Sequence, residues 1–148
     1  MADGTEKLPR GIRNKNPGNI KLGTDWDRLA DEQSDPVFCV FKEAVWGIRA
    51  LVKILLTYRF HHKRFTVESI IERWAPPSEN DTDAYIAFVC RKLGVNPTDE
   101  LNNTIEDYLP LVKAIIQMEN GMQPYDDELL VEGMYKAWEG LPTNSTAS

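Results

Sequence analysis

The feature that most constrains the fold of this chain is an apolar pattern that runs from Glu43 to about Phe60. Apolar residues recur there at three- and four-residue spacing, at Ala44, Ile48, Leu51, Val52, Leu55 and Leu56. This spacing places side chains on one face of an α-helix, and Glu43 and Lys53 fall on its polar positions. Gly47 lies inside the pattern and indicates that a neighbouring element packs closely there. The stretch therefore predicts a long helix with one buried face.

Capping residues delimit two further helices. Thr66 can cap a short helix with the sequence VESIIERW, which a pair of prolines stops two residues later. Ser78 with Asp81 forms a capping box that opens the next helix, which runs through Leu93 and ends at Gly94 as its C-terminal cap.

Two more helices are predicted in the last third of the chain. Pro110 suits the first turn of a helix whose apolar stripe leads to Glu119, and a glycine two residues later closes it. Asp126 and Asp127 begin a last helix that carries apolar residues as far as Trp138. Helices therefore account for most of the predicted structure.

A small β-element is expected near the N-terminus. The run PVFCVF at 36–41 reads as a strand, and residues 20–22 could pair with it as a hairpin or short irregular sheet. The predicted fold class is thus mainly α, or α+β with a minor β part. Residues 1–10 are expected to form a flexible arm, 11–140 a single domain, and 141–148 a disordered tail.

Composition restricts the class of protein. With 42% hydrophobic and 27% charged residues, the chain has the balance of a soluble globular protein. Its net charge of −6 argues against nucleic-acid binding and gives no attraction to anionic membranes. Cys39 and Cys90 each sit in an apolar run, which favours two buried free thiols, although a pairing across the core stays open.

The N-terminal sequence contains no signal-peptide core, and no apolar run approaches the length of a membrane span. We therefore expect synthesis in the cytoplasm without stable membrane insertion.

The segment from Gly11 to Lys21 reads GIRNKNPGNIK and is a polar turn with Pro-Gly at its centre. Asn14, Asn16 and Asn19 surround the turn. Their amides offer donors and acceptors that suit the hydroxyl and acetamido groups of a sugar. A turn stabilised by side-chain caps explains the same residues, and the turn chemistry alone favours this structural explanation.

Glu119 is the candidate acid. It lies four residues after Ile115 and eight after Leu111, so it extends the core-facing side of its helix. A carboxyl beside apolar surface loses hydration, and its pKa is then expected to rise toward the range of a general acid. A surface glutamate near a helix end is an equally good explanation of its position.

The segment WAPPSENDTDAY, from Trp74 to Tyr85, supplies a second group of candidates. Trp74 offers a flat surface for a sugar ring, and polar groups follow at Glu79, Asn80, Thr82 and Tyr85. Helix capping and core packing explain much of the same segment.

No metal or cofactor is expected. His61 and His62 follow the long helix, where the helix dipole favours them, and no other ligand stands at a suitable spacing. The sequence also contains no Gly-rich phosphate loop and no nucleophile–histidine set in a plausible context.

Three segments resemble lysozyme-fold peptidoglycan hydrolases. NPGNIK at 16–21, Trp26 and VFCVFKEAVWGIRALVKIL resemble the corresponding run of flagellar-type glucosaminidases, and WAPPSENDTDAYIAFV resembles their later tyrosine-containing segment. The order of these segments, followed by a glutamate two residues before a glycine, is similar to that of small phage and prophage proteins described as virion structural or lytic proteins. The resemblance covers nearly residues 10–138 and implies a lysozyme-like helical domain.

The chain departs from the glucosaminidase pattern in the place of its acid. In that family the catalytic glutamate precedes the asparagine-containing segment, whereas here only Glu6 does so, in an arm too short for a helix. The nearest match is Met118–Gly121, after everything else. A circular permutation of the lysozyme-like core would explain this order. The resemblance then implies that Glu119 is the acid; without the permutation, the chain would retain only a binding cleft.

The implied activity is cleavage of the β-1,4 bond between N-acetylmuramic acid and N-acetylglucosamine, with Glu119 as general acid. With one acid, attack by the substrate's own 6-hydroxyl would make the protein a lytic transglycosylase. With Glu79 as base or electrostatic partner, it would be a muramidase. The residues expected to bind the sugar are Asn16, Asn19, Trp74, Asn80, Thr82 and Tyr85.

The implied biological setting is that of a phage endolysin or virion-associated enzyme. Its partners would be peptidoglycan glycan strands and other virion proteins, reached in the cell wall through a holin, the virion or a secretion system. The alternative is a catalytically inactive virion structural or peptidoglycan-binding protein on the same fold. A helical nucleic-acid binder is disfavoured by the acidic charge.

Overall fold

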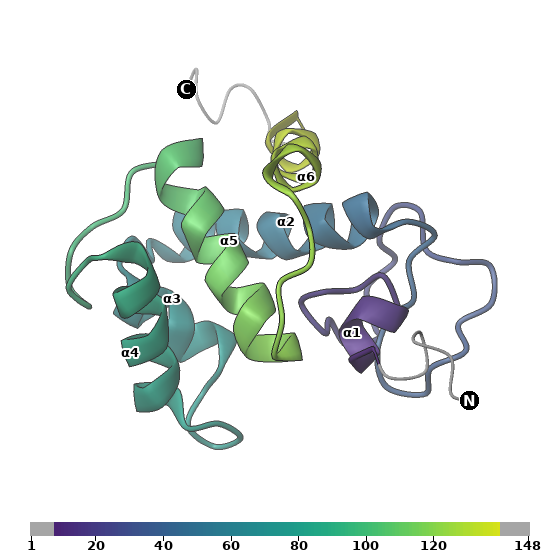
Figure 1. The fold of residues 1–148 in the computed structure, drawn as a ribbon, viewed down its shortest axis with the longest axis horizontal. Coiled ribbons are helices and arrows are strands. Elements are labelled where there is room, and N and C mark those ends of the chain that lie inside the picture. Colours follow the sequence, from purple (N-terminus) through teal and green to yellow (C-terminus); the bar gives the residue numbers. More distant parts are fainter. Residues whose placement is uncertain (1–7, 140–148) are drawn as a thin grey trace. The chain divides into compact units, whose positions relative to one another are not determined.

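The computed structural model describes residues 8–139 and is mainly helical over that range, as the sequence predicts (Figure 1). The chain divides into two compact units, one comprising Met1–Lys53 with Pro124–Ser148 and the other comprising Ile54–Gln123. The boundary falls inside the long second helix. Over the described range, no helix combines the length and the apolar character needed to cross a bilayer.

The first unit contains α1 (Arg10–Arg13), the N-terminal half of α2 (Ala44–His62) and α6 (Asp127–Glu139). The long helix predicted from the apolar pattern is therefore confirmed. α6 packs closely on α2, because a Cβ atom built on Gly133 would lie 2.5 Å from Cγ2 of Ile48. Glycine at this position lets the two helices approach each other where a larger residue would hold them apart.

The loop that contains Asn14, Asn16 and Asn19 packs closely on α2 at Gly47. A Cβ atom on Gly47 would overlap the backbone carbonyl oxygen of Lys15 and would lie 3.0 Å from Cδ of Pro17. The prediction that Gly47 marks close packing is confirmed, and the partner is the loop that contains the Pro-Gly turn.

The β-element expected near the N-terminus consists of isolated antiparallel bridges, which pair Lys21 with Phe38 and Leu29 with Phe41. Side-chain hydrogen bonds take the place of a longer ladder. Nδ2 of Asn16 donates to the carbonyl oxygens of Ile20 and Cys39, and its Oδ1 accepts from the Ile20 N–H. Backbone groups that a hairpin would pair with each other are thus partly satisfied by one amide.

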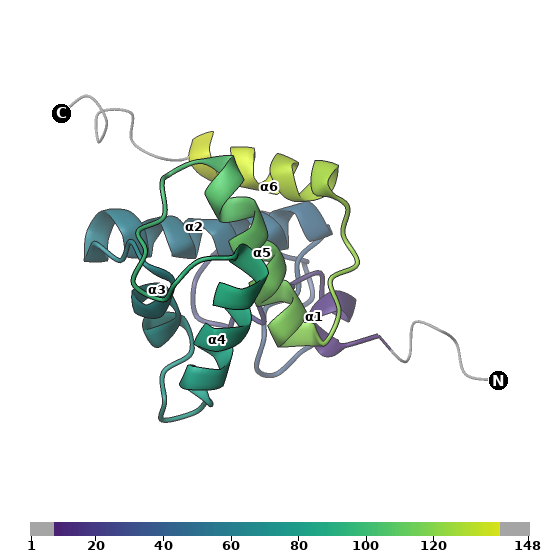
Figure 2. The ribbon, with the colours of Figure 1, turned by 60° about the vertical axis from the view of Figure 1, so that its left-hand side comes forward.

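The second unit contains the C-terminal part of α2 together with α3 (Val67–Trp74), α4 (Thr82–Leu93) and α5 (Ile105–Asn120). α4 contacts both α3 and α5, and the three helices lie together in both ribbon views (Figures 1 and 2). Their apolar stripes form a core in which Tyr108 and Ile115 of α5 are fully buried.

The starts of α3 and α4 show one confirmed cap and one corrected cap. Thr66 caps α3 as predicted, in a capping box with Ser69. α4 begins at Thr82 because the Asp81 side chain accepts a hydrogen bond from the Ala84 N–H, so Asp81 is the N-cap. The predicted capping box between Ser78 and Asp81 is therefore wrong, since the cap falls three residues later.

The start of α5 is also corrected. The helix begins at Ile105, where the Thr104 side chain accepts from the Asp107 N–H, and Pro110 lies inside it. The predicted start at Pro110 is wrong because the threonine cap nearly two turns earlier nucleates the helix. Gly121 closes α5 in the left-handed conformation, as expected.

The ends of the chain are only partly covered by the described range. The predicted arm at 1–10 lies outside it except for residues 8–10, and the predicted tail at 141–148 lies wholly outside it. Arg10 begins α1 and forms an ion pair with Asp35 at 2.6 Å. Cys39 and Cys90 are both buried free thiols, which confirms the favoured prediction.

Candidate functional site

Three side chains singled out in the sequence meet within the second unit. The Tyr85 hydroxyl donates a hydrogen bond to Oε2 of Glu119 at 3.0 Å. Nε1 of Trp74 donates to the Tyr85 hydroxyl oxygen at 3.0 Å and to the same Glu119 oxygen at 3.2 Å. We call these three residues the hydrogen-bonded trio. Tyr85 and Trp74 lie 34 and 45 positions before Glu119 in the chain, so only the packing of the helices brings the three together.

Each member of the trio is positioned by a helix terminus. Trp74 is the last residue of α3, and Tyr85 lies in the first turns of α4, whose start is set by Asp81. Glu119 lies one residue before the end of α5, just ahead of Gly121. Because α4 packs against both neighbouring helices, the ends of α3 and α5 are brought to the same side chain of α4.

Tyr85 is the most buried member of the trio, with 4% of its surface exposed, whereas Trp74 and Glu119 are half-buried. Burial raises the pKa of the Tyr85 phenol, and the neighbouring charge of Glu119 and the hydrogen bond to it raise this pKa further. The phenol therefore keeps its proton at neutral pH, so Tyr85 is the donor and Glu119 the acceptor.

The other predicted residues of the 74–85 segment lie beside the trio in sequence but make separate contacts. Oγ1 of Thr82 donates to the Ala75 carbonyl oxygen, and Nδ2 of Asn80 donates to the Pro76 carbonyl oxygen at 3.2 Å. Glu79 is exposed in the turn between α3 and α4. These hydrogen bonds fix the turn that sets the direction of α4.

The same turn borders a hollow of about 370 Å³, which is lined by Glu72, Pro77, Asn80, Asp81, Thr82 and Asp83. Three of the six lining residues are carboxylates. Such a surface can accept hydrogen bonds from hydroxyl and amide groups. Asn80 and Thr82 are the predicted sugar-binding residues that face it.

The two predicted asparagines lie in the first unit. Asn16 is fully buried, and its amide bonds to the backbone of its own loop. Asn19 is half-buried and adopts a left-handed backbone with φ of 51°. The geometry gives Asn16 a structural role in shaping the loop, and direct contact with a sugar stays a prediction for both residues.

Sequence reasoning missed a second hollow, of about 230 Å³, which lies along α5. Its lining includes Lys113 and Gln117 of α5, together with Lys92 of α4. The signal was present, because Pro110, Lys113, Ala114 and Gln117 recur at helical spacing. Helical spacing alone does not show which residues of a neighbouring helix lie beside that stripe.

Among residues 8–139, no group of three or more histidine, cysteine or carboxylate side chains is arranged to hold a metal ion. His61 and His62 form the end of α2, where they lie in its last turn. Burial and the nearby charges of Arg73, His61 and Arg64 lower the pKa of His62.

The comparisons with known proteins place the chain in a phage protein family. It is 44% identical over 128 residues to Protein P5 of Pseudoalteromonas phage PM2, in an alignment covering 84% of this chain and 79% of that protein. The chain therefore belongs to the same family as this phage protein. No family model matches the sequence.

Proposed function

We propose that the protein is a peptidoglycan glycosidase with a lysozyme-like fold, in which Glu119 is the general acid. The observation that carries this proposal is the meeting of Trp74 and Tyr85 on Oε2 of Glu119, because the sequence predicts all three as site residues. The name of the phage relative states no activity, so the proposal rests on the trio and on the resemblance of the sequence.

The trio assigns a distinct task to each side chain. Tyr85 and Trp74 hold Oε2 of the carboxyl group, and we assign Oε1 as the atom that carries the catalytic proton. A fixed carboxyl group presents its proton to the substrate in one geometry. Trp74 then acts mainly as a positioning residue, through its indole N–H.

The proposed reaction begins when Glu119 transfers its proton to the glycosidic oxygen. The bond between C1 and this oxygen breaks, the bonding electrons stay on the oxygen, and the sugar passes through an oxocarbenium-like transition state. The substrate's 6-hydroxyl then attacks C1 and returns a proton to the Glu119 carboxylate, which gives a 1,6-anhydro sugar. The two donors on Oε2 stabilise the carboxylate while it is charged.

In the hydrolytic version of this proposal, Glu79 is the second carboxylate. It is exposed in the turn before α4, and there it would activate a water molecule in place of the 6-hydroxyl. Asn80 and Thr82 would orient the sugar from the hollow beside that turn. In either version, Glu119 occupies its late position through a circular permutation of the lysozyme-like core, and delivery to the cell wall follows the virion, a holin or a secretion system.

A second candidate function is a non-catalytic virion or peptidoglycan-binding protein of the same fold. The trio joins the ends of α3 and α5 to α4, which is also what a purely structural carboxylate would do. Membership of a phage family is compatible with both candidates.

The decisive experiment measures loss of turbidity of purified peptidoglycan with the wild type and with Glu119→Gln. The matched control is Glu106→Gln, which removes an exposed carboxylate from the first turn of the same helix. We expect Glu119→Gln to abolish cleavage and Glu106→Gln to preserve it. Activity that survives Glu119→Gln would reject the acid assignment.

Mass spectrometry of the released fragments separates the remaining outcomes. Anhydro ends indicate a transglycosylase, and reducing ends indicate a hydrolase, in which case Glu79→Gln should also lower the rate. Binding of the wild type to peptidoglycan without any released product would instead support the second candidate.

A further inference from the structure

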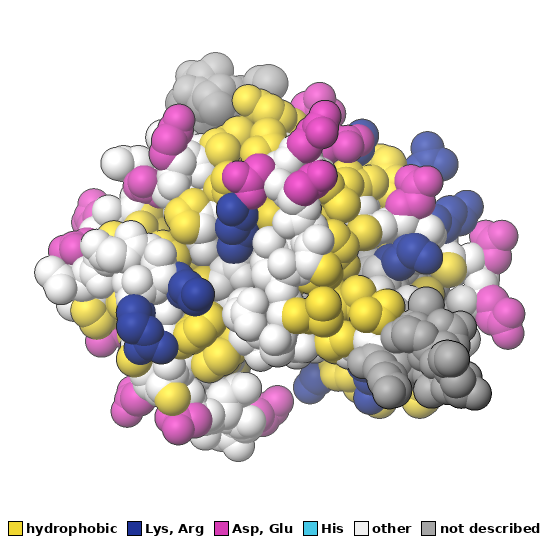
Figure 3. All heavy atoms as spheres, in the orientation of Figure 1, with side chains coloured by type: hydrophobic (Ala, Val, Ile, Leu, Met, Phe, Trp, Pro, Cys, Tyr) yellow, Lys and Arg dark blue, Asp and Glu magenta, His cyan; other side chains and the backbone are white. Residues whose placement is uncertain are grey.

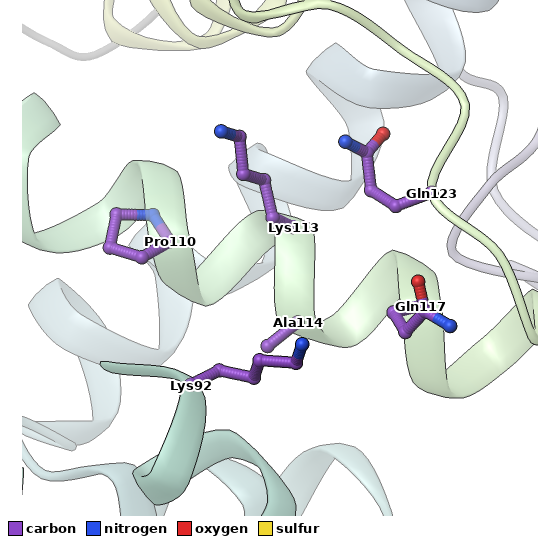
Figure 4. Close-up of a pocket in the computed structure, with 6 residues that line it drawn as sticks. All are labelled: Lys92, Pro110, Lys113, Ala114, Gln117 and Gln123. Atoms are coloured by element: carbon purple, nitrogen blue, oxygen red, sulfur yellow. The ribbon is translucent and has the colours of Figure 1, made fainter. Parts of the chain in front are cut away.

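A hollow lies along α5, and its lining includes no residue of the hydrogen-bonded trio. It has a volume of about 230 Å³ and is lined by Lys92, Pro110, Lys113, Ala114, Gln117 and Gln123. We call it the α5 hollow. Figure 4 shows Lys92 reaching from α4 along one side of α5, with Lys113 and Gln123 on the other side.

The α5 hollow and Glu119 lie on opposite sides of the same helix. The lining residues of α5 recur three, four and seven positions after Pro110, which places them on one stripe. Glu119 is nine positions after Pro110, or about two and a half turns at 3.6 residues per turn. Half a turn of offset directs Glu119 away from the hollow, so the two are separate sites.

The α5 hollow is basic within an acidic protein. Two of its six lining residues are lysines and none is a carboxylate, although the chain has a net charge of −6. Within residues 8–139, no carboxylate oxygen lies within 4.0 Å of Nζ of Lys92, which instead lies 5.6 Å from the centre of the Phe88 ring. Figure 3 shows Lys or Arg side chains over α5 and over the adjoining α4 on this face.

Amide groups and a small apolar floor complete the lining. Nε2 of Gln117 donates to the Gly121 carbonyl oxygen at 3.0 Å, which holds that side chain at the end of the hollow. Pro110 and Ala114 supply the floor. Pro110 has no N–H to give to the Glu106 carbonyl oxygen four residues earlier, so the helix has a local break in its hydrogen bonding at this point.

We propose that the α5 hollow binds the free carboxylate end of a short peptide. The two ammonium groups attract the carboxylate, the glutamine amides suit the peptide group before it, and the floor of Pro110 and Ala114 accepts a methyl side chain. The hollow is smaller than the cavities that hold drug-sized ligands, which limits the bound part to one or two residues.

The source to which we assign this carboxylate is the D-alanyl-D-alanine end of a peptidoglycan stem peptide, an assignment that rests on the proposed function. A stem peptide bound on the far side of α5 from Glu119 would hold the enzyme on the cell wall between cleavage events. The α5 hollow would thus be an anchoring site, distinct from the place where the glycan is cleaved.

The test is a titration of the ¹⁵N-labelled wild type with N-acetyl-D-alanyl-D-alanine, followed by NMR chemical shifts. We expect shifts confined to the residues of the α5 hollow. The same peptide with a C-terminal amide should bind about tenfold more weakly or worse, because a hydrogen bond to a charged group contributes about 1.5–3 kcal/mol and 1.4 kcal/mol is tenfold in affinity. Lys92→Met with Lys113→Met should weaken binding by at least a similar factor.

The control variant is Lys42→Met, which removes a half-exposed lysine from the first unit and should bind as the wild type does. Lys92→Met alone guards against misfolding of the double variant, since Lys92 is exposed in the last turn of α4. Equal affinity for the amidated peptide, unchanged binding by the lysine variants, or tighter binding of inorganic phosphate would each overturn the proposal. Tighter binding of the L,L-peptide would overturn the assigned source.

This experiment also separates the inference from the proposed function. Glu119→Gln should bind the dipeptide as the wild type does, because Glu119 lies on the opposite side of α5. Dipeptide binding by a protein that cleaves no peptidoglycan would leave the α5 hollow intact as a carboxylate site and reject the glycosidase. Cleavage without dipeptide binding would reject the α5 hollow alone.

Discussion

The contact between Tyr85 and Glu119 predicts a measurable coupling in the free energy of unfolding. Tyr85→Phe removes one hydroxyl group and leaves the buried ring in place, so packing changes little. The lost bond to Glu119 is one to a charged group, for which mutational series give about 1.5–3 kcal/mol. Because Glu119 is half-buried, water replaces part of this interaction, and we expect a loss of about 1.5 kcal/mol.

The hydrogen bond that the Tyr85 oxygen accepts from Trp74 adds little to this loss of stability. Nε1 of Trp74 keeps its hydrogen bond to Glu119 at 3.2 Å when the Tyr85 oxygen is removed. Glu119→Gln retains an oxygen acceptor and should cost about 1 kcal/mol, as a charged bond becomes a neutral one. Since both variants act on one bond, the double variant should be more stable than additivity predicts by about 1 kcal/mol.

The assay is urea unfolding at pH 7, monitored by circular dichroism, for the wild type, the two single variants and the double variant. Tyr135→Phe is the matched control, because Tyr135 is 57% exposed and its loss of a hydroxyl should change stability by less than about 0.5 kcal/mol. A Tyr85→Phe variant as stable as this control, or strict additivity of the two changes, would show that the hydrogen bond does not form in solution. Either result would reject the role that we assign to Tyr85 in holding Glu119.

Three further predictions concern the scaffold. Gly47→Ala should lower the free energy of unfolding by about 1–3 kcal/mol in urea, because its methyl group would overlap the Lys15 carbonyl oxygen; a stability equal to wild type would contradict the packing of the loop on α2. Pro110→Ala should raise it by about 1–3 kcal/mol by restoring a helical hydrogen bond, and a fall in stability would show that the ring is needed. Hydrogen bonds from Arg10 hold the pKa of Asp35 in the folded protein well below its usual 3.8. The Asp35 carboxylate therefore stabilises the folded state fully above pH 3.8, and this stabilisation is lost as the pH falls below that value. The melting temperature should drop less steeply between pH 7 and 3 for Asp35→Asn than for the wild type, and parallel curves would refute this.

Local patterns were the part of the fold that could be predicted. The apolar spacing defined α2, and Thr66 and Gly121 marked helix ends because a cap depends on residues within one turn of it. The same locality produced the error at Pro110, which suits a first turn but sits inside α5. The Thr104 cap upstream sets the start of α5, and the preference of proline for a first turn does not take such a cap into account.

The residues of the candidate site could be predicted from the sequence, but the contacts between them could not. Trp74, Tyr85 and Glu119 could each be selected by residue type and position, but the same evidence also selected Asn16, whose amide is spent on its own loop. Type and spacing do not reveal which polar group is already satisfied. That depends on the neighbours that folding provides.

The sequence by itself determined the helical class, most helix ends and the family, because these depend on short-range spacing and on residue identity. Only the tertiary structure decided that Trp74 donates to Glu119 across 45 positions, and that Lys92 of α4 lines the same hollow as Lys113 of α5. The physical reason is that periodicity fixes which face of a helix is apolar, whereas the packing of α4 between α3 and α5 fixes which side chains meet.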